Sequence, residues 1–387
     1  MFLFDVFIYL SFAWIMHILA YKSNDKYVKA EGIDIYMYVY VVFFAIVSGV
    51  RFGVGSDFYP YAWQFDKGML QTNLDNRSSE FLWVYFVQYF NRLDLHYTIG
   101  MGLVGFIQFL FIYNAIKRWK NMLIYLPFVL FGGWFILSIW GGMRQMIVVC
   151  AFVYMSRWIF ERKCIHYFSS ILILHYIHNS ALLLIPLYFI PANFTLSSKR
   201  NFCLLLFAAC FILGQMPQFQ NAIDFLTSFA NVAGYDDYVG QIHAKLSGQD
   251  VETRAFGPTM LSYLLLCFSV IFYSPQLKER FSFSIPTFEL WYCFSYIFSC
   301  GFFLFCNVSH IFLRPVSYFM MFLMLMITLL VIYFKENLEF YVNHYYVLLI
   351  LNWIGLIWTL YRMSQTSTFD YISYKFFWNH SLYENIF

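Results

Sequence analysis

The chain has 387 residues, of which 61% are hydrophobic, 24% are aromatic and only 12% are charged. So few polar side chains cannot cover a water-soluble surface, and the composition therefore excludes a soluble globular protein. The formal net charge of +3 is spread over many short loops, which indicates orientation in a lipid bilayer and not nucleic-acid binding.

Long apolar runs recur along the whole chain. A run of about 20 apolar residues can cross the hydrocarbon core as a helix, and the first run lacks the basic region and cleavage pattern of a removed signal peptide. We therefore expect an all-α, polytopic integral membrane protein with about 10–12 transmembrane helices, forming one domain over residues 1–387. The runs cover residues 1–21, 35–50, 95–116, 121–140, 146–160, 165–190, 202–216, 255–273, 290–313, 315–334 and 341–361.

Basic residues in the short loops predict which side of the membrane each loop faces. Lys and Arg accumulate on the cytoplasmic side, so the basic loops at 22–29, 117–120, 157–163, 199–200 and 278–280 are expected there. The amino terminus then lies outside, and residues 51–94 form a first external loop. Within this loop, Phe81–Phe90 is too short to cross and is predicted to be a re-entrant or interfacial helix.

The run at 165–190 does not fit a single crossing. Basic residues flank it on both sides, at Lys163 and at Lys199, and both should be cytoplasmic. We therefore predict a hairpin of two short helices, bent at His178 and Asn179, that lines a cavity near the external face. Residues 217–256 then form a large external loop, whose Tyr235 and Tyr238 suggest an ordered lid.

Six polar side chains fall on the external side in this topology, near the outer ends of five segments. They are Arg51, Asp57, Arg144, Gln145, His178 and Arg314. Guanidinium groups bind phosphate oxygens in a bidentate way and stay charged, and the glycines beside Arg51 and Arg144 allow a ligand to approach the backbone. The pattern predicts a site for the phosphate or pyrophosphate of a membrane-embedded substrate.

Asp57 and His178 are the titratable groups left for proton transfer. Either can accept a proton from a hydroxyl nucleophile, and His175, one helical turn before His178, is a rival base. Structural explanations stay open, because Asp57 could pair with Arg51 and a lone histidine in an apolar run is more often a buried structural residue. No P-loop, GxGxxG or DxD motif occurs at this site, so no nucleotide, metal or cofactor is predicted.

Five short motifs together resemble the EpsG-type O-antigen polymerases of the Wzy class, and the resemblance covers most of the chain. The motifs are Arg51-x-Gly-x-Gly-x-Asp57-x-x-x-Tyr61, Ser138-x-x-Gly-Gly-x-Arg144-Gln145, Ile177-His178-Asn-Ser180-Ala-Leu, Tyr235-x-x-Tyr238 and an arginine, Arg314, that leads a late apolar run. The block around Arg144 and the block around His178 are the most specific of them.

The resemblance implies a multi-pass enzyme of the bacterial inner membrane with a periplasmic active site and an architecture like that of the GT-C glycosyltransferases. Such a metal-independent, cofactor-free polymerase transfers a growing chain from undecaprenyl pyrophosphate to a sugar hydroxyl of another lipid-linked unit. Undecaprenyl pyrophosphate-linked oligosaccharides are then both donor and acceptor, and a chain-length-regulating membrane protein is a candidate partner.

The resemblance also assigns roles to the site residues. Arg51, Arg144 and Arg314 bind the pyrophosphate, Asp57 or His178 removes the acceptor proton, and Arg144 acts in catalysis by stabilising the leaving group. Gln145 orients a sugar or phosphate oxygen. Aromatic side chains stack on sugar rings, which is the role expected for Tyr235 and Tyr238 in the external loop.

Three other functions remain open from the sequence. An O-antigen ligase would use the same donor with a different acceptor, and a membrane acyltransferase also has histidines in apolar segments. A lipid-linked saccharide flippase predicts charges along a path through the membrane and paired repeats. Here the charges gather on one side, and no repeat is visible in the sequence.

Overall fold

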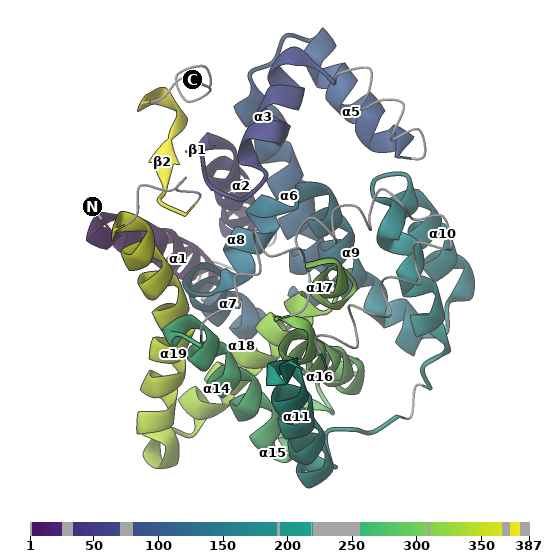
Figure 1. Ribbon diagram of the computed structural model, residues 1–387, viewed down its shortest axis with the longest axis vertical. Coiled ribbons are helices and arrows are strands. Elements are labelled where there is room, and N and C mark those ends of the chain that lie inside the picture. The colour runs from purple at the N-terminus through teal and green to yellow at the C-terminus, as the bar shows by residue number, and fades with distance from the viewer. Residues whose placement is uncertain are drawn as a thin grey trace.

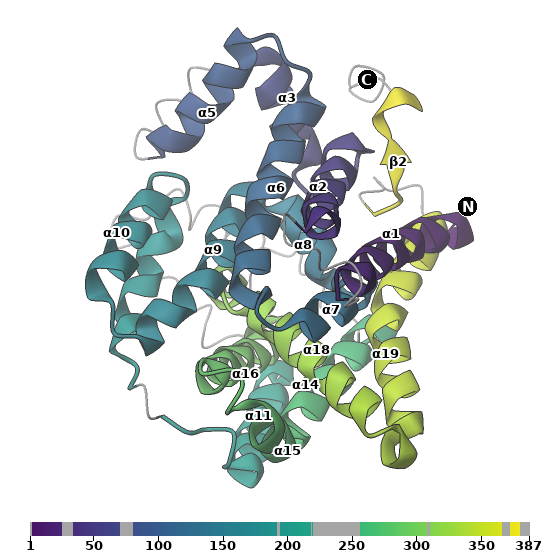
Figure 2. The same ribbon diagram turned by 180° about the vertical axis from the view of Figure 1, so that it is seen from behind.

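The computed structural model describes residues 2–24, 34–69, 80–191, 194–217, 219, 256–307, 310–365 and 372–379. Nearly all of this part of the chain is helical, and its strands form one antiparallel pair. Figures 1 and 2 show the molecule from opposite sides, with α5 and α10 on one flank, α19 on the opposite flank, and α11 and α15 at the lower end between them.

The first half of the chain forms α1 Phe2–Asn24, α2 Ile35–Val50, β1 Arg51–Phe52, α3 Phe58–Lys67, α5 Phe81–Arg92, α6 Tyr97–Ile116, α7 Lys120–Gly132, α8 Trp134–Gly141, α9 Met143–Phe160, α10 Cys164–His175 and the 3₁₀ helix η2 Asn179–Phe189. The second half forms α11 Arg200–Gln215, α14 Pro258–Phe272, α15 Ser274–Phe281, α16 Phe288–Phe305, α17 His310–Ser317, α18 Met320–Glu336, α19 Leu338–Gln365, β2 Lys375–Phe376 and the 3₁₀ turn η4 Phe377–Asn379.

Five of the described helices, α1, α6, α9, α16 and α19, are long and apolar enough to cross a membrane. The number rises to seven if two bent pairs, α7 with α8 and α14 with α15, each form one span. The all-α, polytopic membrane class is therefore confirmed. Fewer helices pass this length test than the about 10–12 crossings expected, because several apolar helices, such as α2, α10, η2 and α11, have 17 residues or fewer.

Two expected runs are divided differently from the prediction. The run at 121–140 bends by 77° between α7 and α8, at Gly133. Arg314 was expected to lead a span that begins at Pro315, because proline favours helix starts. Instead, both residues lie inside the short helix α17, and the span-like helix α18 begins only at Met320. The Ser317 hydroxyl donates to the Arg314 carbonyl (2.7 Å) near the end of α17.

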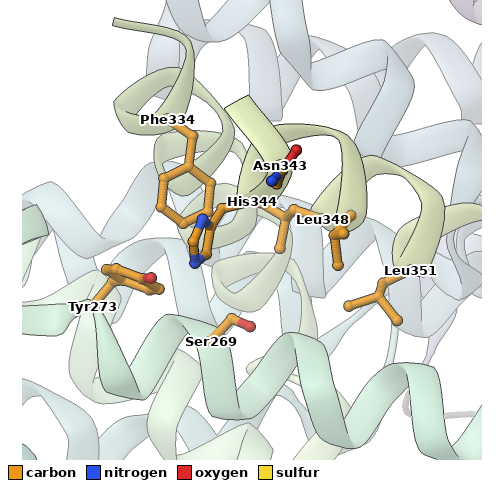
Figure 3. Close-up of a pocket in the computed structure, with 8 residues that line it drawn as sticks. Ser269, Tyr273, Phe334, Asn343, His344, Leu348 and Leu351 are labelled. Carbon is orange, nitrogen blue, oxygen red and sulfur yellow. The ribbon is translucent and has the colours of Figure 1, made fainter. Parts of the chain in front are cut away.

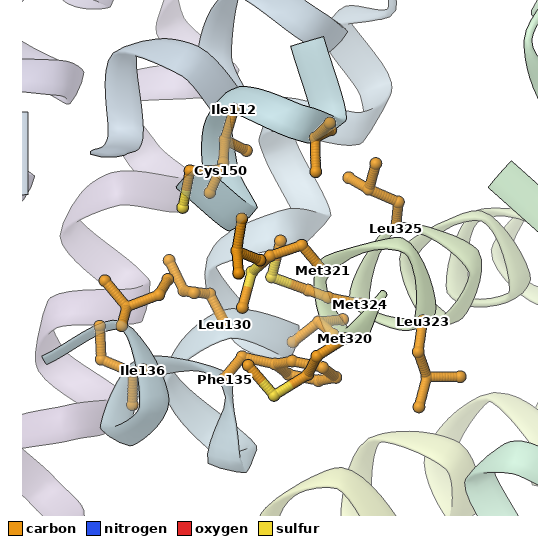
Figure 4. Packing of buried hydrophobic residues seen from close by; sticks show 14 of the residues in the cluster. Ile112, Leu130, Phe135, Ile136, Cys150, Met320, Met321, Leu323, Met324 and Leu325 are labelled. Atoms are coloured by element: carbon orange, nitrogen blue, oxygen red, sulfur yellow. The ribbon is translucent and has the colours of Figure 1, made fainter. Parts of the chain in front are cut away.

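The core is centred on α18, which is buried around its whole circumference. Every residue from Met320 to Ile332 is buried, as expected for a helix that is apolar on all sides. Figure 4 shows Met320, Met321 and Met324 directed toward Leu130 of α7 and Phe135 of α8. The bent α7–α8 unit is therefore packed on one side against α18. This packing fixes the end of α8, which leads directly into α9.

Small residues allow α2 and α6 to pack closely. A Cβ on Gly105 would stand 2.4 Å from the Ser48 Cβ, and a Cβ on Gly49 would stand 2.6 Å from the Thr98 carbonyl oxygen. Close backbone contact of this kind is typical of helix pairs in membranes. It fixes the end of α2, and with it the position of Arg51.

Two of the loops that the charge rule places on the cytoplasmic side, and the segment after a third, contact one another. Lys120 donates to the Ser23 carbonyl (3.1 Å), and Trp119 Nε1 donates to the Ser284 carbonyl (2.8 Å). These bonds join the end of α1, the start of α7 and the segment after α15. The loops therefore share one side of the molecule, and the identity of that side stays a prediction.

The segment at 164–189 changes from α10 to η2 across residues 176–178. The two short helices pack against each other, and the Arg162 guanidinium donates to the Tyr188 (2.8 Å) and Ile190 (2.5 Å) carbonyls. The end of η2 thus lies beside the start of α10. The chain enters and leaves this hairpin on the same side, and the bend carries His178.

The carboxyl-terminal segment returns to the loop that follows α2. β2 pairs with β1 in antiparallel fashion, with Arg51 opposite Phe376, and the Tyr374 hydroxyl donates to the Val47 carbonyl (2.6 Å). Figure 1 shows β2 beside β1, with the N-terminus nearby. Arg51 and the segment at 372–379 therefore lie on one side of the membrane domain.

Candidate active site

Arg144 lies in the first turn of α9, which begins directly after the Gly141–Gly142 pair. Its Nη1 forms an ion pair with the Glu80 carboxylate, and its Nε donates to the Tyr61 hydroxyl (3.4 Å). The Arg144 side chain is only 14% exposed. Nη2 makes no hydrogen bond with a described residue, so the guanidinium keeps donors for an anionic ligand.

Glu80 connects the two blocks that the sequence singled out. It precedes α5, and its buried carboxylate contacts Arg144 through Oε2. Through Oε1 it accepts hydrogen bonds from His178 Nδ1 (3.1 Å) and from the Asn179 backbone N–H (3.1 Å). Burial by itself raises the pKa of Glu80, but the hydrogen bond from His178 and the charge of Arg144 outweigh it, so the pKa lies below its usual value. Glu80 is therefore ionised at neutral pH.

His178 is held in the bend by contacts between α5 and the hairpin. The Tyr176 carbonyl accepts hydrogen bonds from the N–H groups of Leu82 (3.1 Å) and Trp83 (3.4 Å) in the first turn of α5, where helical N–H groups lack partners within the helix; the Trp83 N–H is shared with the Glu80 carbonyl (3.1 Å). The Phe81 and Tyr176 rings lie 4.4 Å apart. These contacts place the start of α5 against the bend, and the rival base His175 instead approaches the Asn179 carbonyl (3.2 Å).

Gln145 and Arg314 are brought together through the main chain. The Gln145 amide donates to the Arg314 carbonyl (2.9 Å) and to the Ser317 hydroxyl (2.8 Å), which ties α17 to the first turn of α9. The Arg314 side chain is exposed and makes no hydrogen bond or ion pair with a described residue. Next to this contact, the Ser180 and Tyr318 hydroxyls are hydrogen-bonded (2.6 Å), which joins η2 to the same turn.

Arg51 lies close to this group but points into the protein. It is 1% exposed, and its guanidinium donates to the carbonyls of Ser48, Val54 (3.2 Å) and Trp140 (3.3 Å). Burial lowers the pKa of Arg51 to about 10, so the side chain stays charged at neutral pH. In this structure Arg51 holds its loop to the end of α8 and presents no donor to the surface, in contrast to its expected contact with pyrophosphate.

Asp57 does not form the ion pair with Arg51 that the sequence allowed. It is exposed at the start of α3, makes no side-chain bond to that helix, and forms no ion pair with a described residue. Its carboxylate is therefore open to solvent on the side of the Arg51 loop. Tyr235 and Tyr238, the expected lid residues, lie outside the described residues.

The described part of the chain shows a cavity apart from this site, and no cluster of metal ligands. No group of three or more His, Cys, Asp or Glu residues there could hold a metal ion. A cavity of about 250 Å³ opens between α14, α18 and α19 and is lined by Tyr273, Phe334 and His344 (Figure 3). Phe334 precedes Lys335, so the cavity lies toward the predicted cytoplasmic side and contains none of the expected site residues.

Comparison with known families agrees with the family resemblance of the sequence. The family model described as EpsG family matches residues 34–376, which is nearly the whole chain. The chain belongs to the EpsG family. This EpsG-family protein is accordingly a polysaccharide polymerase-like membrane protein with glycosyltransferase-type chemistry. No curated protein and no solved structure shows significant similarity to it, so the GT-C-like architecture stays a prediction.

The sequence did not identify Glu80 as a site residue. Its two side-chain partners in this EpsG-family chain are 64 and 98 positions away, and no local pattern reports contacts over such distances. One signal was present, because Glu80 stands directly before an aromatic helix too short to span the membrane. An acidic residue at that position favours the helix start and lies at the predicted membrane surface.

Proposed function

We propose that this EpsG-family protein is an O-antigen or related polysaccharide polymerase of the bacterial inner membrane. It transfers a growing oligosaccharide from undecaprenyl pyrophosphate to a sugar hydroxyl of another lipid-linked repeat unit at the periplasmic face. The observation that carries the proposal is the meeting of Arg144 and His178 on one buried carboxylate, because this arrangement brings an anion-binding group and a proton acceptor into one site.

Arg144 and Arg314 bind the pyrophosphate of the donor. Arg144 is held by Glu80 and Tyr61 and keeps Nη2 for phosphate oxygens, while Arg314 lies on the helix that Gln145 ties to the start of α9. Positive charge held in place before the reaction stabilises the negative charge that develops on the leaving group. These arginines make a metal-independent transfer chemically reasonable.

His178 is the base in this proposal, and Asp57 is the alternative. The acceptor hydroxyl oxygen attacks the anomeric carbon of the donor chain, and its proton passes to Nε2 of His178. The bond between the anomeric carbon and the pyrophosphate oxygen breaks, and its electron pair leaves with undecaprenyl pyrophosphate. Tyr235 and Tyr238 in the external loop are proposed to cover the saccharide by stacking.

The proposal is tested with purified protein and lipid-linked repeat units. Wild type should produce a ladder of polymer on the lipid carrier, whereas Arg144→Ala and His178→Ala should each reduce the rate by about a hundredfold. Arg280→Ala is the matched control, because Arg280 pairs with Glu336 on the predicted cytoplasmic side. It should retain the wild-type ladder.

Other outcomes would identify the alternative functions. If wild type forms no ladder but moves a single chain to a lipid A core acceptor, the protein is a ligase. If lipid-linked units cross a vesicle membrane without a new glycosidic bond, it is a transporter. Transfer of an acyl group in place of a sugar chain would assign it to the acyltransferases. Each of these results contradicts the polymerase proposal.

A further inference from the structure

We propose that Glu80 is a positioning residue for the transfer reaction, acting through His178. Glu80 holds the imidazole so that Nδ1 carries the hydrogen and Nε2 is free to accept the acceptor's proton. This inference rests on the proposed function, since it assumes that His178 is the base. It assigns a role in the reaction to a residue that the sequence motifs left out.

The hydrogen-bond partners define the state of the imidazole. An ionised carboxylate only accepts hydrogen bonds, and the lowered pKa of Glu80 keeps it ionised at neutral pH. His178 Nδ1, 3.1 Å from Glu80 Oε1, must therefore be the donor. The neutral imidazole then has its lone pair on Nε2, which is the atom that a general base needs.

The carboxylate is itself held in place. The Asn179 N–H donates to the same Oε1 (3.1 Å), and Arg144 contacts Oε2. The Glu80 side chain is 6% exposed, against 23% for His178. The base is thus the more accessible member of the pair, and the residue behind it is buried and fixed, as in sites where a buried acid orients a histidine.

Glu80 also has an electrostatic effect on proton transfer. When His178 takes the acceptor's proton it becomes a cation, and a carboxylate 3.1 Å from Nδ1 stabilises that cation. Arg144 balances the carboxylate in the resting state. One side chain therefore links the group that binds the leaving pyrophosphate to the group that activates the nucleophile.

A second, partly buried glutamate shows what a purely structural carboxylate looks like in this protein. Glu289 accepts bonds from the Leu196 and Ser197 N–H groups (3.2 and 3.3 Å) and pairs with Lys278 (3.0 Å) on the predicted cytoplasmic side. Like Glu80 it binds backbone N–H groups and a cation, but no histidine contacts it. Glu289→Gln is therefore a matched control for Glu80→Gln.

The test is a double-mutant cycle in the polymerisation assay. Glutamine has the shape of glutamate and an acceptor oxygen for the Asn179 N–H, but no charge. Glu80→Gln should lower kcat at least about tenfold in the wild-type background. In the His178→Ala background the same change should cost much less than in the wild-type background, because Glu80 would have no base left to orient and only its contact with Arg144 would be lost.

The remaining arms separate a positioning role from a structural one. Glu289→Gln should change the rate by the same factor in the wild-type and His178→Ala backgrounds. Glu80→Asp provides a second variant if Glu80→Gln does not elute as a folded protein. An equal loss for Glu80→Gln in both backgrounds, or no loss in either, would overturn the inference while the polymer ladder of wild type still supports the proposed function. Absence of that ladder from wild type would instead contradict the proposed function.

Discussion

Gly55 offers a sharp test of how the Arg51 loop is built. Its φ of +101° is rarely adopted by L side chains, and a Cβ there would stand 2.6 Å from the Trp140 carbonyl oxygen. That same oxygen accepts a hydrogen bond from Arg51 Nη2 (3.3 Å). Gly55→Ala should therefore push the loop away from the end of α8 and weaken the contact that holds Arg51.

The size of the effect follows from two separate costs. A backbone conformation unsuited to alanine costs about 1–3 kcal/mol, and forcing a methyl group against a fixed backbone atom costs about 1–3 kcal/mol more. The sum, about 2–6 kcal/mol, is an upper range, because movement of the loop relieves part of it. Thermal unfolding in detergent, followed by tryptophan fluorescence, measures the loss of stability.

Gly142→Ala, between α8 and α9, is the matched control. Gly142 lies two residues before Arg144. In contrast to Gly55, a Cβ there would meet no atom within 4 Å, and its φ is −79°. We expect its stability to stay within about 0.5 kcal/mol of wild type. If Gly55→Ala unfolds at the same temperature as wild type and Gly142→Ala, the described loop geometry is wrong.

Three further predictions concern stability and the carboxyl terminus. Truncation after Gln365 removes β2 and the Tyr374 bond to the Val47 carbonyl, so it should lower both thermal stability and polymerisation; a truncated protein as active as wild type would contradict this. The pKa of Glu80 in the folded protein lies below its usual 4.5. The ionised carboxylate therefore contributes fully to the free energy of unfolding above pH 4.5, and this contribution is lost as the pH falls through the pKa of the folded state. The stability difference between wild type and Glu80→Gln, followed by thermal unfolding at decreasing pH, should therefore shrink in acid, and a constant difference would argue against an ionised Glu80. Glu289→Gln should cost about 1–3 kcal/mol in the same unfolding assay and leave kcat unchanged.

Local patterns in the sequence were enough to predict the fold class, and they selected two residues that the structure brings together. Apolar runs predicted helices, and conflicting charges around residues 165–190 predicted a bend where the structure changes from α10 to η2. Arg144 and His178, which the short motifs selected, share the Glu80 carboxylate. Each of these inferences depends on hydrophobicity and charge over a short stretch of chain.

The orientation of individual side chains could not be predicted in this way. An arginine after an apolar helix is equally compatible with a headgroup, a ligand or buried carbonyl groups, and only the close packing of α2 on α6 and the end of α8 turn Arg51 inward. Glu80 acquires its partners from α9 and from the bend before η2. Both outcomes depend on tertiary contacts that no local pattern contains.

In the proposed reaction, Arg144 and His178 promote the transfer of a chain from a lipid pyrophosphate to a sugar hydroxyl. The most direct measurement counts free undecaprenyl pyrophosphate and new glycosidic bonds in the same reaction of purified protein with lipid-linked repeat units. One lipid pyrophosphate should be released for each bond formed, and both products should be suppressed together in Arg144→Ala. Polymer growth without release of lipid pyrophosphate, or release without polymer growth, would contradict it.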